Sequence, residues 1–367
     1  MKNLFFALLL TTCIFSCNSE KMEKIDADNA NIYYTGRIDF SDPKAVKYCW
    51  PGVSIKAKFE GKKCTILLNH YHFGMNEYGK EMHNYYNLIV DGKLRVLKAA
   101  NKDSSYSIDS LSDGIHTLEL FKRTEGFVGY GEFKGFELEK GKKLLPIEHL
   151  RRKIEFIGNS ITCGYGNEGE SEYCHFIPAL ENHYMAYAAI TARNLNAEHH
   201  TIAFSGKGLY RNYNNTTYET MPDLYDRIFV FDSTVKWNFT KWTPDIVVIN
   251  LGTNDFAGSN PDSTTWVTTY LNFIKTIRKH YPDAFVFCTN GPMTNDEIRN
   301  NEPAVVTLTR YINTVVSIAH SNGDNKIASH FYPPQTPPFG CNYHPGIKTH
   351  QKMAEELTAL IKQKLNW

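Results

Sequence analysis

The stretch Ile154-Glu155-Phe156-Ile157-Gly158-Asn159-Ser160-Ile161-Thr162 decides the fold of this chain. Its apolar run, 154–157, lies between a basic cluster and a glycine, which is typical of a short buried strand. Gly158 allows the backbone to turn sharply, so Ser160 is expected at the exit of that strand. In open α/β sheets, ligands bind just outside the carboxyl ends of the strands. Ser160 is therefore a candidate nucleophile, although Gly-Asn-Ser is also an ordinary turn sequence.

Beyond residue 150, strand and helix patterns alternate. Apolar runs predict strands at 201–204, 245–250 and 284–288, and apolar residues at helical spacing predict helices near 186–195, 266–277, 305–319 and 353–361. Repeated βα units favour a mostly parallel sheet with helices on both faces. The pattern predicts a three-layer α/β/α domain over residues 150–367.

The preceding region, 32–146, has the pattern of an all-β domain. Strand-like runs occur at 53–59, 64–68, 86–90, 117–121 and 133–138, and Asp-Gly pairs mark two of the turns. Short strands at this spacing indicate a β-sandwich or jelly roll. The basic segment 140–152, which contains a proline, marks the boundary between the two domains.

The first residues have the pattern of an export signal. Lys2 precedes an apolar run at 4–10 that is too short to span a bilayer comfortably. Ser16-Cys17 then resembles the end of a bacterial lipoprotein signal, with Cys17 as the lipidated residue. We therefore expect a signal peptide at 1–16, a polar tether at 17–31 and a lipid anchor in a membrane. The alternative is a simple secretory peptide with an incidental cysteine.

Composition excludes several functions. The chain has 367 residues, a formal net charge of +1 and no long basic run, so nucleic-acid binding is not expected. The mature cysteines include no CxxC pair, and His70, His72 and His83 have no carboxylate or cysteine partner at a ligand spacing. No metal site is therefore expected. A Cys163–Cys174 disulfide is left open by their proximity in the sequence.

Four loops bring together the residues that acyl transfer needs. Three follow predicted parallel strands, whose ends meet at one edge of the sheet, and the fourth precedes the last helix. Ser160 can serve as nucleophile and His344 as general base. The backbone N–H groups of Ser160 and Gly206, with the side-chain amide of Asn254, can form an oxyanion hole.

These residues carry a family resemblance. Ser160, Gly206, Asn254 and His344 stand in the order that names the SGNH, or GDSL-like, hydrolases, and Gly-Thr-Asn-Asp is among the more specific motifs of that superfamily. Gly-Asn-Ser-Ile-Thr, Ser-Gly-Lys-Gly and Gly-Thr-Asn-Asp-Phe resemble carbohydrate esterase family 2 over roughly residues 32–367. The resemblance implies a β-sandwich before an SGNH domain, and removal of acetyl groups from plant polysaccharides such as xylan and glucomannan. The lipoprotein-like signal, in turn, implies an exported protein in a Gram-negative cell envelope, in the periplasm or on the outer-membrane surface.

One position departs from the wider superfamily. The usual acid, three residues before the histidine, is replaced by Cys341. We therefore predict a Ser160–His344 dyad in which a main-chain carbonyl orients the imidazole, as in members of the family. The alternative is an acid from elsewhere, such as Asp324 or Asp296.

Other polar and aromatic residues near these loops have weaker roles. Asp255 is predicted to anchor its loop, and His350 to be a packing or surface residue. Tyr165, Phe256 and Tyr343 flank the catalytic positions, where they could stack on a sugar or close the core.

The sequence thus predicts a serine esterase that removes O-acetyl groups from polysaccharides or oligosaccharides through an acetyl-enzyme, without cofactor. Two alternatives are an SGNH esterase or lipase acting on small or lipid esters, and a catalytically inactive glycan-binding surface lipoprotein.

Overall fold

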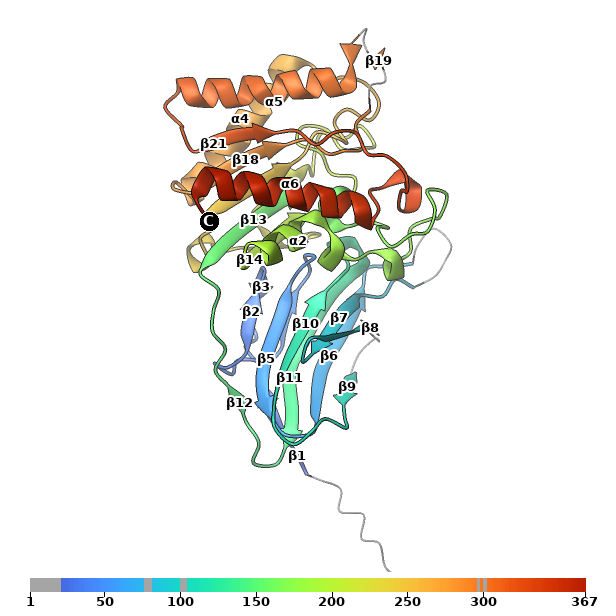
Figure 1. Cartoon of the computed structure of the whole chain (residues 1–367), viewed down its shortest axis with the longest axis vertical. Helices are drawn as coiled ribbons and strands as arrows, with labels where there is room; N and C mark the ends of the chain where they lie inside the picture. Colours follow the sequence, from blue (N-terminus) through green and yellow to red (C-terminus); the bar gives the residue numbers. More distant parts are fainter. Residues whose placement is uncertain (1–20, 76–80, 100–103, 296–297, 300–301) are drawn as a thin grey trace, which may run out of the picture.

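The computed structural model of the chain describes residues 21–75, 81–99, 104–295, 298–299 and 302–367. Figure 1 shows an N-terminal β-sandwich stacked end to end on a C-terminal α/β part. The predicted signal, with Cys17, lies outside the described residues.

The N-terminal part, as the strand spacing predicted, is a sandwich of two antiparallel sheets. One has the strand order β3-β4-β11-β6-β9 with β1 on β11, and the other has the order β12-β5-β10-β7-β8 with β2 on β5. Its strands are β1 (Met22–Asp26), β2 (Tyr33–Thr35), β3 (Ile38–Asp39), β4 (Val46–Tyr48), β5 (Ser54–Glu60), β6 (Cys64–His72), β7 (Tyr85–Val90), β8 (Lys93–Lys98), β9 (Ser105–Ile108), β10 (Ile115–Lys122), β11 (Gly129–Glu139) and β12 (Leu144–Leu145). In β5, Ile55, Ala57 and Phe59 are buried between the sheets because side chains alternate along a strand.

The predicted tether at 17–31 needs correction. Strand β1 (Met22–Asp26) pairs with β11, with Met22 opposite Glu139 and Asp26 opposite Gly135. The sandwich therefore begins within the region expected to be a tether. This strand has no fully buried side chain, and its short polar sequence gives no strand signal.

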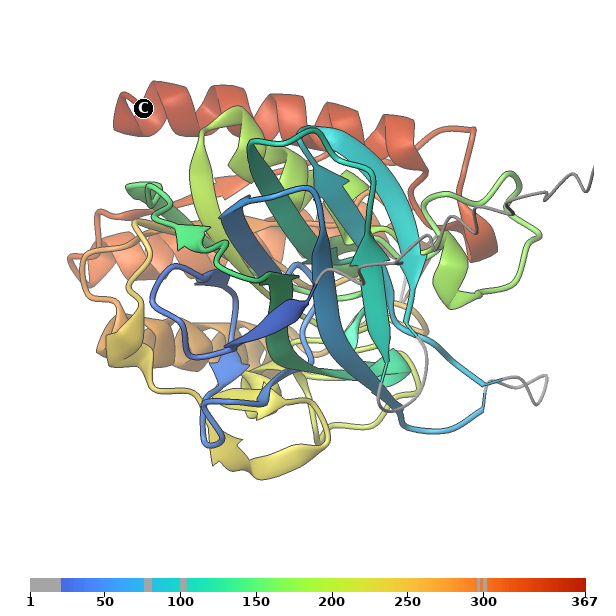
Figure 2. The same ribbon diagram turned by 90° about the horizontal axis from the view of Figure 1, so that it is seen from below.

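The C-terminal part is built on a five-stranded parallel sheet in the order β14-β13-β17-β18-β21. Its strands are β13 (Arg152–Gly158), β14 (Ala197–Ala203), β17 (Ile246–Asn250), β18 (Phe285–Thr289) and β21 (Ile327–His330), and two hairpins add β15 (Arg227–Phe229) with β16 (Asp232–Lys236) and β19 (Ile298–Arg299) with β20 (Glu302–Pro303). The helices are α1 (Ser160–Cys163), α2 (Tyr187–Asn194), α3 (Met221–Leu224), α4 (Ser263–His280), α5 (Ala304–Ser321) and α6 (Ile347–Leu365). Figure 2 shows α6 running along one side of the molecule.

Two cores flank this sheet and make the three predicted layers. Ile154 and Phe156 of β13 pack with the buried faces of α2 and α6, whereas Ile157 packs on the side of α4 and α5. The alternation along β13 therefore explains why one apolar run serves both faces of the sheet.

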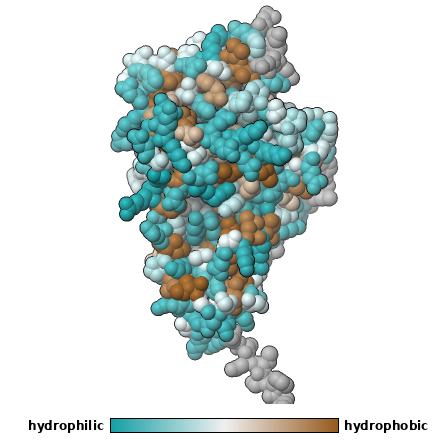
Figure 3. Space-filling model, in the orientation of Figure 1, coloured by the Kyte–Doolittle hydropathy of each residue, from teal (hydrophilic) through white to brown (hydrophobic). Residues whose placement is uncertain are grey.

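The outside of the molecule is predominantly polar. On the face in Figure 3, hydrophobic residues form separate small spots among hydrophilic ones. In the part of the chain that the structure describes, no helix combines the length and apolarity needed to cross a membrane.

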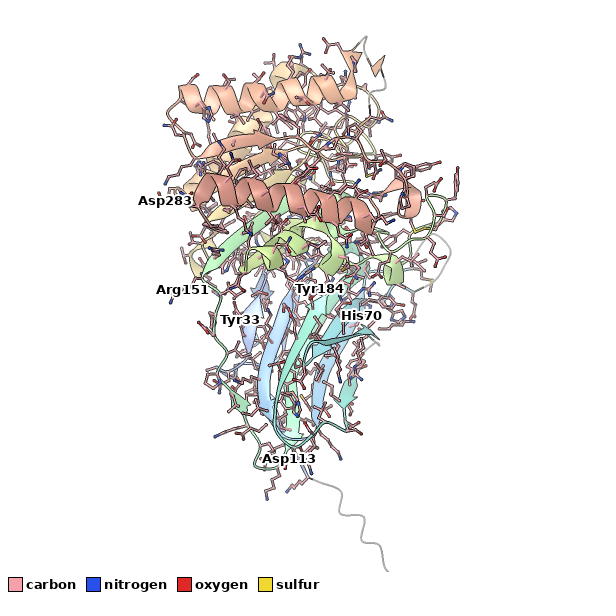
Figure 4. The ribbon with its side chains drawn as sticks, viewed as in Figure 1. Tyr33, His70, Asp113, Arg151, Tyr184 and Asp283 are labelled. Atoms are coloured by element: carbon pink, nitrogen blue, oxygen red, sulfur yellow. A yellow bond between two sulfur atoms is a disulfide. The ribbon has the colours of Figure 1, made fainter. Side chains whose placement is uncertain are left out.

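The sandwich and the α/β part share a buried junction. Trp50 of the sandwich belongs to the same core as α4 and α5, and its Nε1 donates to the carbonyl of Arg227 at 3.1 Å. The buried Arg37 pairs with the buried Glu155 of β13 at 3.1 Å. Tyr33 and Tyr184, from the two parts, lie near this junction in Figure 4. The two parts therefore pack as one body.

Candidate active site

Ser160 lies at a sharp corner between β13 and the short helix α1. A Cβ on Gly158 would come within 2.0 Å of the Thr162 Oγ1, so glycine is required where the strand turns. The side chain of Asn159 caps α1 by accepting from the N–H of Ile161 at 3.1 Å. Gly164 then ends α1 in the left-handed conformation. These residues fix Ser160 at the carboxyl end of the central part of the sheet.

His344 lies beside Ser160 although 184 residues separate them. Its Nε2 is 2.9 Å from the Ser160 Oγ. On the other side of the ring, Nδ1 lies 3.2 Å from the carbonyl oxygen of Cys341 and 3.1 Å from that of Asn342. Main-chain carbonyls thus hold the imidazole in the position where the wider superfamily uses a carboxylate.

The backbone before His344 is unusual. Asn342 and Tyr343 have φ values of 51° and 57°, so two consecutive residues other than glycine are left-handed. Such strain persists only where the surroundings impose it, and it is common at functional sites. Here it turns two carbonyls toward one ring nitrogen.

Of the two alternative acids, Asp324 does not reach this ring. Asp324 binds Arg278, with 2.7 Å between its Oδ2 and the Arg278 Nε. Asp296 lies outside the described residues, so its place is not assigned.

The environment of the half-buried His344 sets the charge of its ring. Loss of hydration lowers the pKa of His344 to about 4, against a smaller opposing effect of its backbone hydrogen bonds to Asn342 and Cys341. At neutral pH the ring is therefore uncharged. With Nδ1–H donating to the carbonyls, Nε2 has a free lone pair for the proton of Ser160.

The predicted oxyanion residues line the same cleft as Ser160. Gly206 follows β14 with a φ of +79°, and a Cβ there would meet no atom within 4 Å. Asn254 follows β17, and its Nδ2 donates to the carbonyl of Lys207 at 2.7 Å. The amide retains a second N–H. Its position links the Asn254 loop to the Gly206 loop.

Asp255 lies in a different environment from the adjacent Asn254. Its buried carboxylate accepts from the backbone N–H groups of Leu209, Tyr210 and Arg211 at 2.7–3.0 Å. Burial raises the pKa of Asp255, and these hydrogen bonds oppose that rise. The residue therefore anchors the loop.

The cleft has a volume of about 720 Å³ and is rimmed by aromatic rings. Tyr343 is 49% exposed, whereas Phe256 is 1% exposed and packs on Trp266. Tyr165 packs on His344 with 4.2 Å between ring centroids. Tyr343 is thus free to meet a ligand, Phe256 closes the core, and Tyr165 supports the histidine.

Two further rim residues, Tyr173 and Tyr213, were not predicted. They are 73% and 68% exposed. Both come from irregular segments with no periodic pattern, so only the high tyrosine content of the chain pointed to them.

The Cys163–Cys174 disulfide, which the sequence left open, is not formed. Cys174 pairs with Cys341, and Cys163 is a buried free cysteine on α1. The loop that carries Cys174 packs on the turn before His344, where the N–H of Asn342 donates to the Cys174 carbonyl at 3.1 Å. The disulfide therefore joins two cysteines that are 167 residues apart, which their spacing in the sequence does not predict.

Four other histidines considered in the sequence occupy structural places. His350, on α6, is buried, and its Nδ1 accepts from the N–H of Tyr187 at 3.2 Å. The ring of His70 packs on two others, with its centroid 6.2 Å from that of His72 and 5.7 Å from that of His83. His70 has both ring nitrogens in hydrogen bonds to protein atoms.

Comparisons with known proteins agree with this architecture. Residues 34–147 match the family described as "Carbohydrate esterase 2 N-terminal", and residues 156–352 match the "GDSL-like Lipase/Acylhydrolase family". The chain is 42% identical over 356 residues to the cellulase/esterase CelE of Acetivibrio thermocellus, covering 95% of this chain and 41% of that longer protein.

Two other relatives match over nearly their whole length. The chain is 27% identical to an acetylxylan esterase / glucomannan deacetylase of Cellvibrio japonicus, covering 100% of both chains. It is 42% identical to the solved structure of a family two carbohydrate esterase from Clostridium thermocellum in complex with cellohexaose, with a TM-score of 0.83 over 92% of this chain and 99% of that one. Both domains, their order and these matches together establish that the chain belongs to the family 2 carbohydrate esterases.

Proposed function

We propose that this chain is a serine esterase that removes O-acetyl groups from plant-type polysaccharides such as xylan and glucomannan. The contact between the Ser160 Oγ and the His344 Nε2, at 2.9 Å, is the observation that carries the proposal. The substrate class is supported by the relatives named as acetylxylan esterase and glucomannan deacetylase.

The reaction runs through an acetyl-enzyme. His344 Nε2 takes the proton of Ser160 as its Oγ attacks the acetyl carbonyl carbon. The bond to the sugar oxygen breaks, and His344 returns the proton to the leaving hydroxyl. Water then attacks the acetyl carbon with His344 again as base, the bond to the Ser160 Oγ breaks, His344 returns the proton to Oγ, and acetate leaves.

Two groups of dipoles stabilise the charges that develop. The N–H groups of Ser160 and Gly206 and the amide of Asn254 donate to the oxyanion. The carbonyls of Cys341 and Asn342, which accept from Nδ1, stabilise the imidazolium that forms. No carboxylate is needed for this dyad.

The open cleft suits a polymer. Its exposed rings, Tyr173, Tyr213 and Tyr343, offer flat apolar faces with polar edges, to which sugar rings can bind. Acetylated polysaccharides or oligosaccharides are therefore the proposed partners.

The test is acetate release from acetylated xylan and acetylated glucomannan by the wild type, Ser160→Ala and His344→Ala. We expect release by the wild type and loss in both variants. Cleavage of an aryl acetate without release from either polymer would favour a small-ester hydrolase. Glycan binding without hydrolysis of any ester would favour a binding protein.

We also propose that the chain is exported and lipid-anchored at Cys17 in a Gram-negative cell envelope, based on the signal-like sequence at 1–17. Partition into detergent by the wild type, lost in Cys17→Ala, is the expected result. Equal partition of the two proteins would contradict the anchor.

A further inference from the structure

A cluster of buried ionisable side chains lies at the junction of the two domains, close to the cleft. Lys122 and Glu125 come from the sandwich, and Cys163 and Glu181 come from the α/β domain. All four have 0% exposure. The proposed reaction uses none of them, and burial of so many ionisable groups is costly unless they are partnered.

Glu125 reaches across the junction to the residue before Gly206. Its Oε2 accepts from the backbone N–H of Ser205 at 2.7 Å, and its Oε1 accepts from the Ser205 hydroxyl. The carboxylate therefore holds both the backbone and the side chain of Ser205. A charged acceptor makes these hydrogen bonds stronger than neutral ones.

Three successive residues of this loop are each held by a contact from elsewhere. Glu125 holds Ser205, the N–H of Tyr213 donates to the Gly206 carbonyl at 2.8 Å, and Asn254 donates to the Lys207 carbonyl at 2.7 Å. Of these contacts, the one to Ser205 comes from the N-terminal domain. Gly206 itself has a permissive backbone, so the direction of its N–H depends on such bracing.

The groups around Glu125 indicate that its carboxyl group is ionised. The N–H of Glu125 donates to the Glu181 Oε2 at 2.9 Å, and burial raises the pKa of both carboxyls. Burial lowers the pKa of Lys122 to about 8, which leaves its ammonium charged at neutral pH. One positive charge balances one carboxylate. Since the hydrogen bonds from Ser205 favour the charged form of Glu125 while burial raises the pKa of Glu181 well above its ordinary value, the proton belongs on Glu181.

A metal ion is a poorer explanation of the same cluster. Glu125, Cys163 and Glu181 offer ligand atoms within 4.8 Å of one another. However, both Glu125 oxygens bind Ser205, and Lys122 already supplies a positive charge. The cluster is complete without a cation.

We propose that Glu125 is a positioning residue for ester hydrolysis, which acts from the N-terminal domain through Ser205 to aim the Gly206 N–H at the oxyanion. The proposal rests on the proposed function of the cleft. It makes the sandwich part of the catalytic machinery, because the α/β domain alone lacks the acceptor for Ser205.

Two matched substitutions test this idea in the full chain. In Glu125→Gln, the amide oxygen can still accept from the Ser205 N–H, but the hydrogen bond to the Ser205 hydroxyl must reverse and the charged acceptor is lost, so we expect kcat to fall about 10- to 100-fold. In Glu181→Gln, the amide mimics the protonated acid, so we expect kcat to stay within about threefold of wild type. KM for an aryl acetate should change by about twofold or less in both variants.

A merely structural role would give a different pattern. If Glu125 and Glu181 only stabilise the fold, both variants should lose thermal stability. Their kcat, corrected for the folded fraction measured by circular dichroism, should then equal that of the wild type. If Glu125→Gln fails to fold, Ser205→Ala decides, with an expected fall in kcat of about 3- to 10-fold. An unchanged kcat in the folded variant would overturn the positioning role of Glu125 but leave the proposed esterase function intact. A wild type that cleaves no ester would overturn both.

Discussion

The uncharged imidazole of His344 sets the acid limit of activity. Because burial lowers its pKa to about 4, Nε2 can accept a proton throughout the neutral range. We expect kcat/KM for an aryl acetate to stay level from pH 8 down to about pH 5, and to fall as the pH approaches 4. Half-loss near pH 6.5, the ordinary value for histidine, would contradict this expectation.

Acid unfolding must be separated from this titration. Burial also lowers the pKa of His183 to about 4 and that of His350 to about 3. Below the ordinary pKa of histidine, the unfolded chain therefore binds more protons than the native one. The free energy of unfolding consequently decreases as the pH is lowered. Tryptophan fluorescence over the same pH range identifies the interval in which the protein remains folded.

Asn254 offers a second test at the reacting atoms. Asn254→Ala removes a proposed oxyanion donor, and the loss of one such donor typically lowers kcat about 100- to 1,000-fold. It also removes the hydrogen bond to the Lys207 carbonyl, so the loop loses a brace. Asn272→Ala, on the exposed side of α4, is the control and should leave kcat unchanged. An Asn254→Ala protein with near-wild-type kcat would contradict the assigned oxyanion hole.

The part of the candidate site that lies in recognisable motifs could be predicted from the sequence. Ser160, Gly206, Asn254 and His344 each follow a strand or precede a helix, so one pattern located all four. Glu125 had no such signal, because the charged run around it resembles a solvated loop. Its burial depends on a second domain that local sequence does not describe.

The turn before α6 depends on the disulfide Cys174–Cys341. This bond joins the Cys174 loop to the residue whose carbonyl accepts from His344. Cys174→Ser should free the turn and lower kcat about 10- to 100-fold, since small displacements of catalytic groups have large effects. It should also reduce the free energy of unfolding by about 2–4 kcal/mol.

A control variant distinguishes the effect of freeing this turn from the effect of losing any buried cysteine. Cys64→Ala removes a buried free cysteine of the sandwich and should leave kcat unchanged, although stability falls. Equal kcat for Cys174→Ser and Cys64→Ala in the oxidised, folded proteins would show that the disulfide does not position His344.

Among the secondary structure elements, those with strong periodicity were predictable. The helices α4, α5 and α6 and the buried strands β13 and β17 lie where the apolar patterns placed them. The strands β1 and β21 were not predicted, since they are short and mostly unburied. Pairing of these edge strands is decided by neighbours far away in the sequence.

At the scale of the whole molecule, a buried ion pair links the two domains across their junction. Arg37 and Glu155 are both fully buried, and the Tyr225 hydroxyl donates to the second Glu155 oxygen at 2.7 Å. Arg37→Met would leave a buried carboxylate without its partner, which typically costs about 3–5 kcal/mol. Urea unfolding of wild type and variant measures the difference.

Two comparisons make this test specific. Arg37→Met/Glu155→Leu should regain most of the lost stability, because no unpaired charge remains. Lys236→Met breaks an exposed pair with Asp226 and should cost less than about 1 kcal/mol. Similar losses for Arg37→Met and Lys236→Met would contradict the role of the buried pair.

The position of β1 has a consequence for the reach of the enzyme. Met22 pairs with Glu139 at one end of the 11-residue strand β11, while the other end follows closely on Glu125 at the junction. At about 3.3 Å per residue, β11 is about 36 Å long. Figure 4 shows Asp113 at the same far end of the sandwich. A chain fixed to a surface by its N-terminus would therefore carry a rigid spacer of that length, which keeps the cleft clear of the surface and open to a polymer passing at a distance.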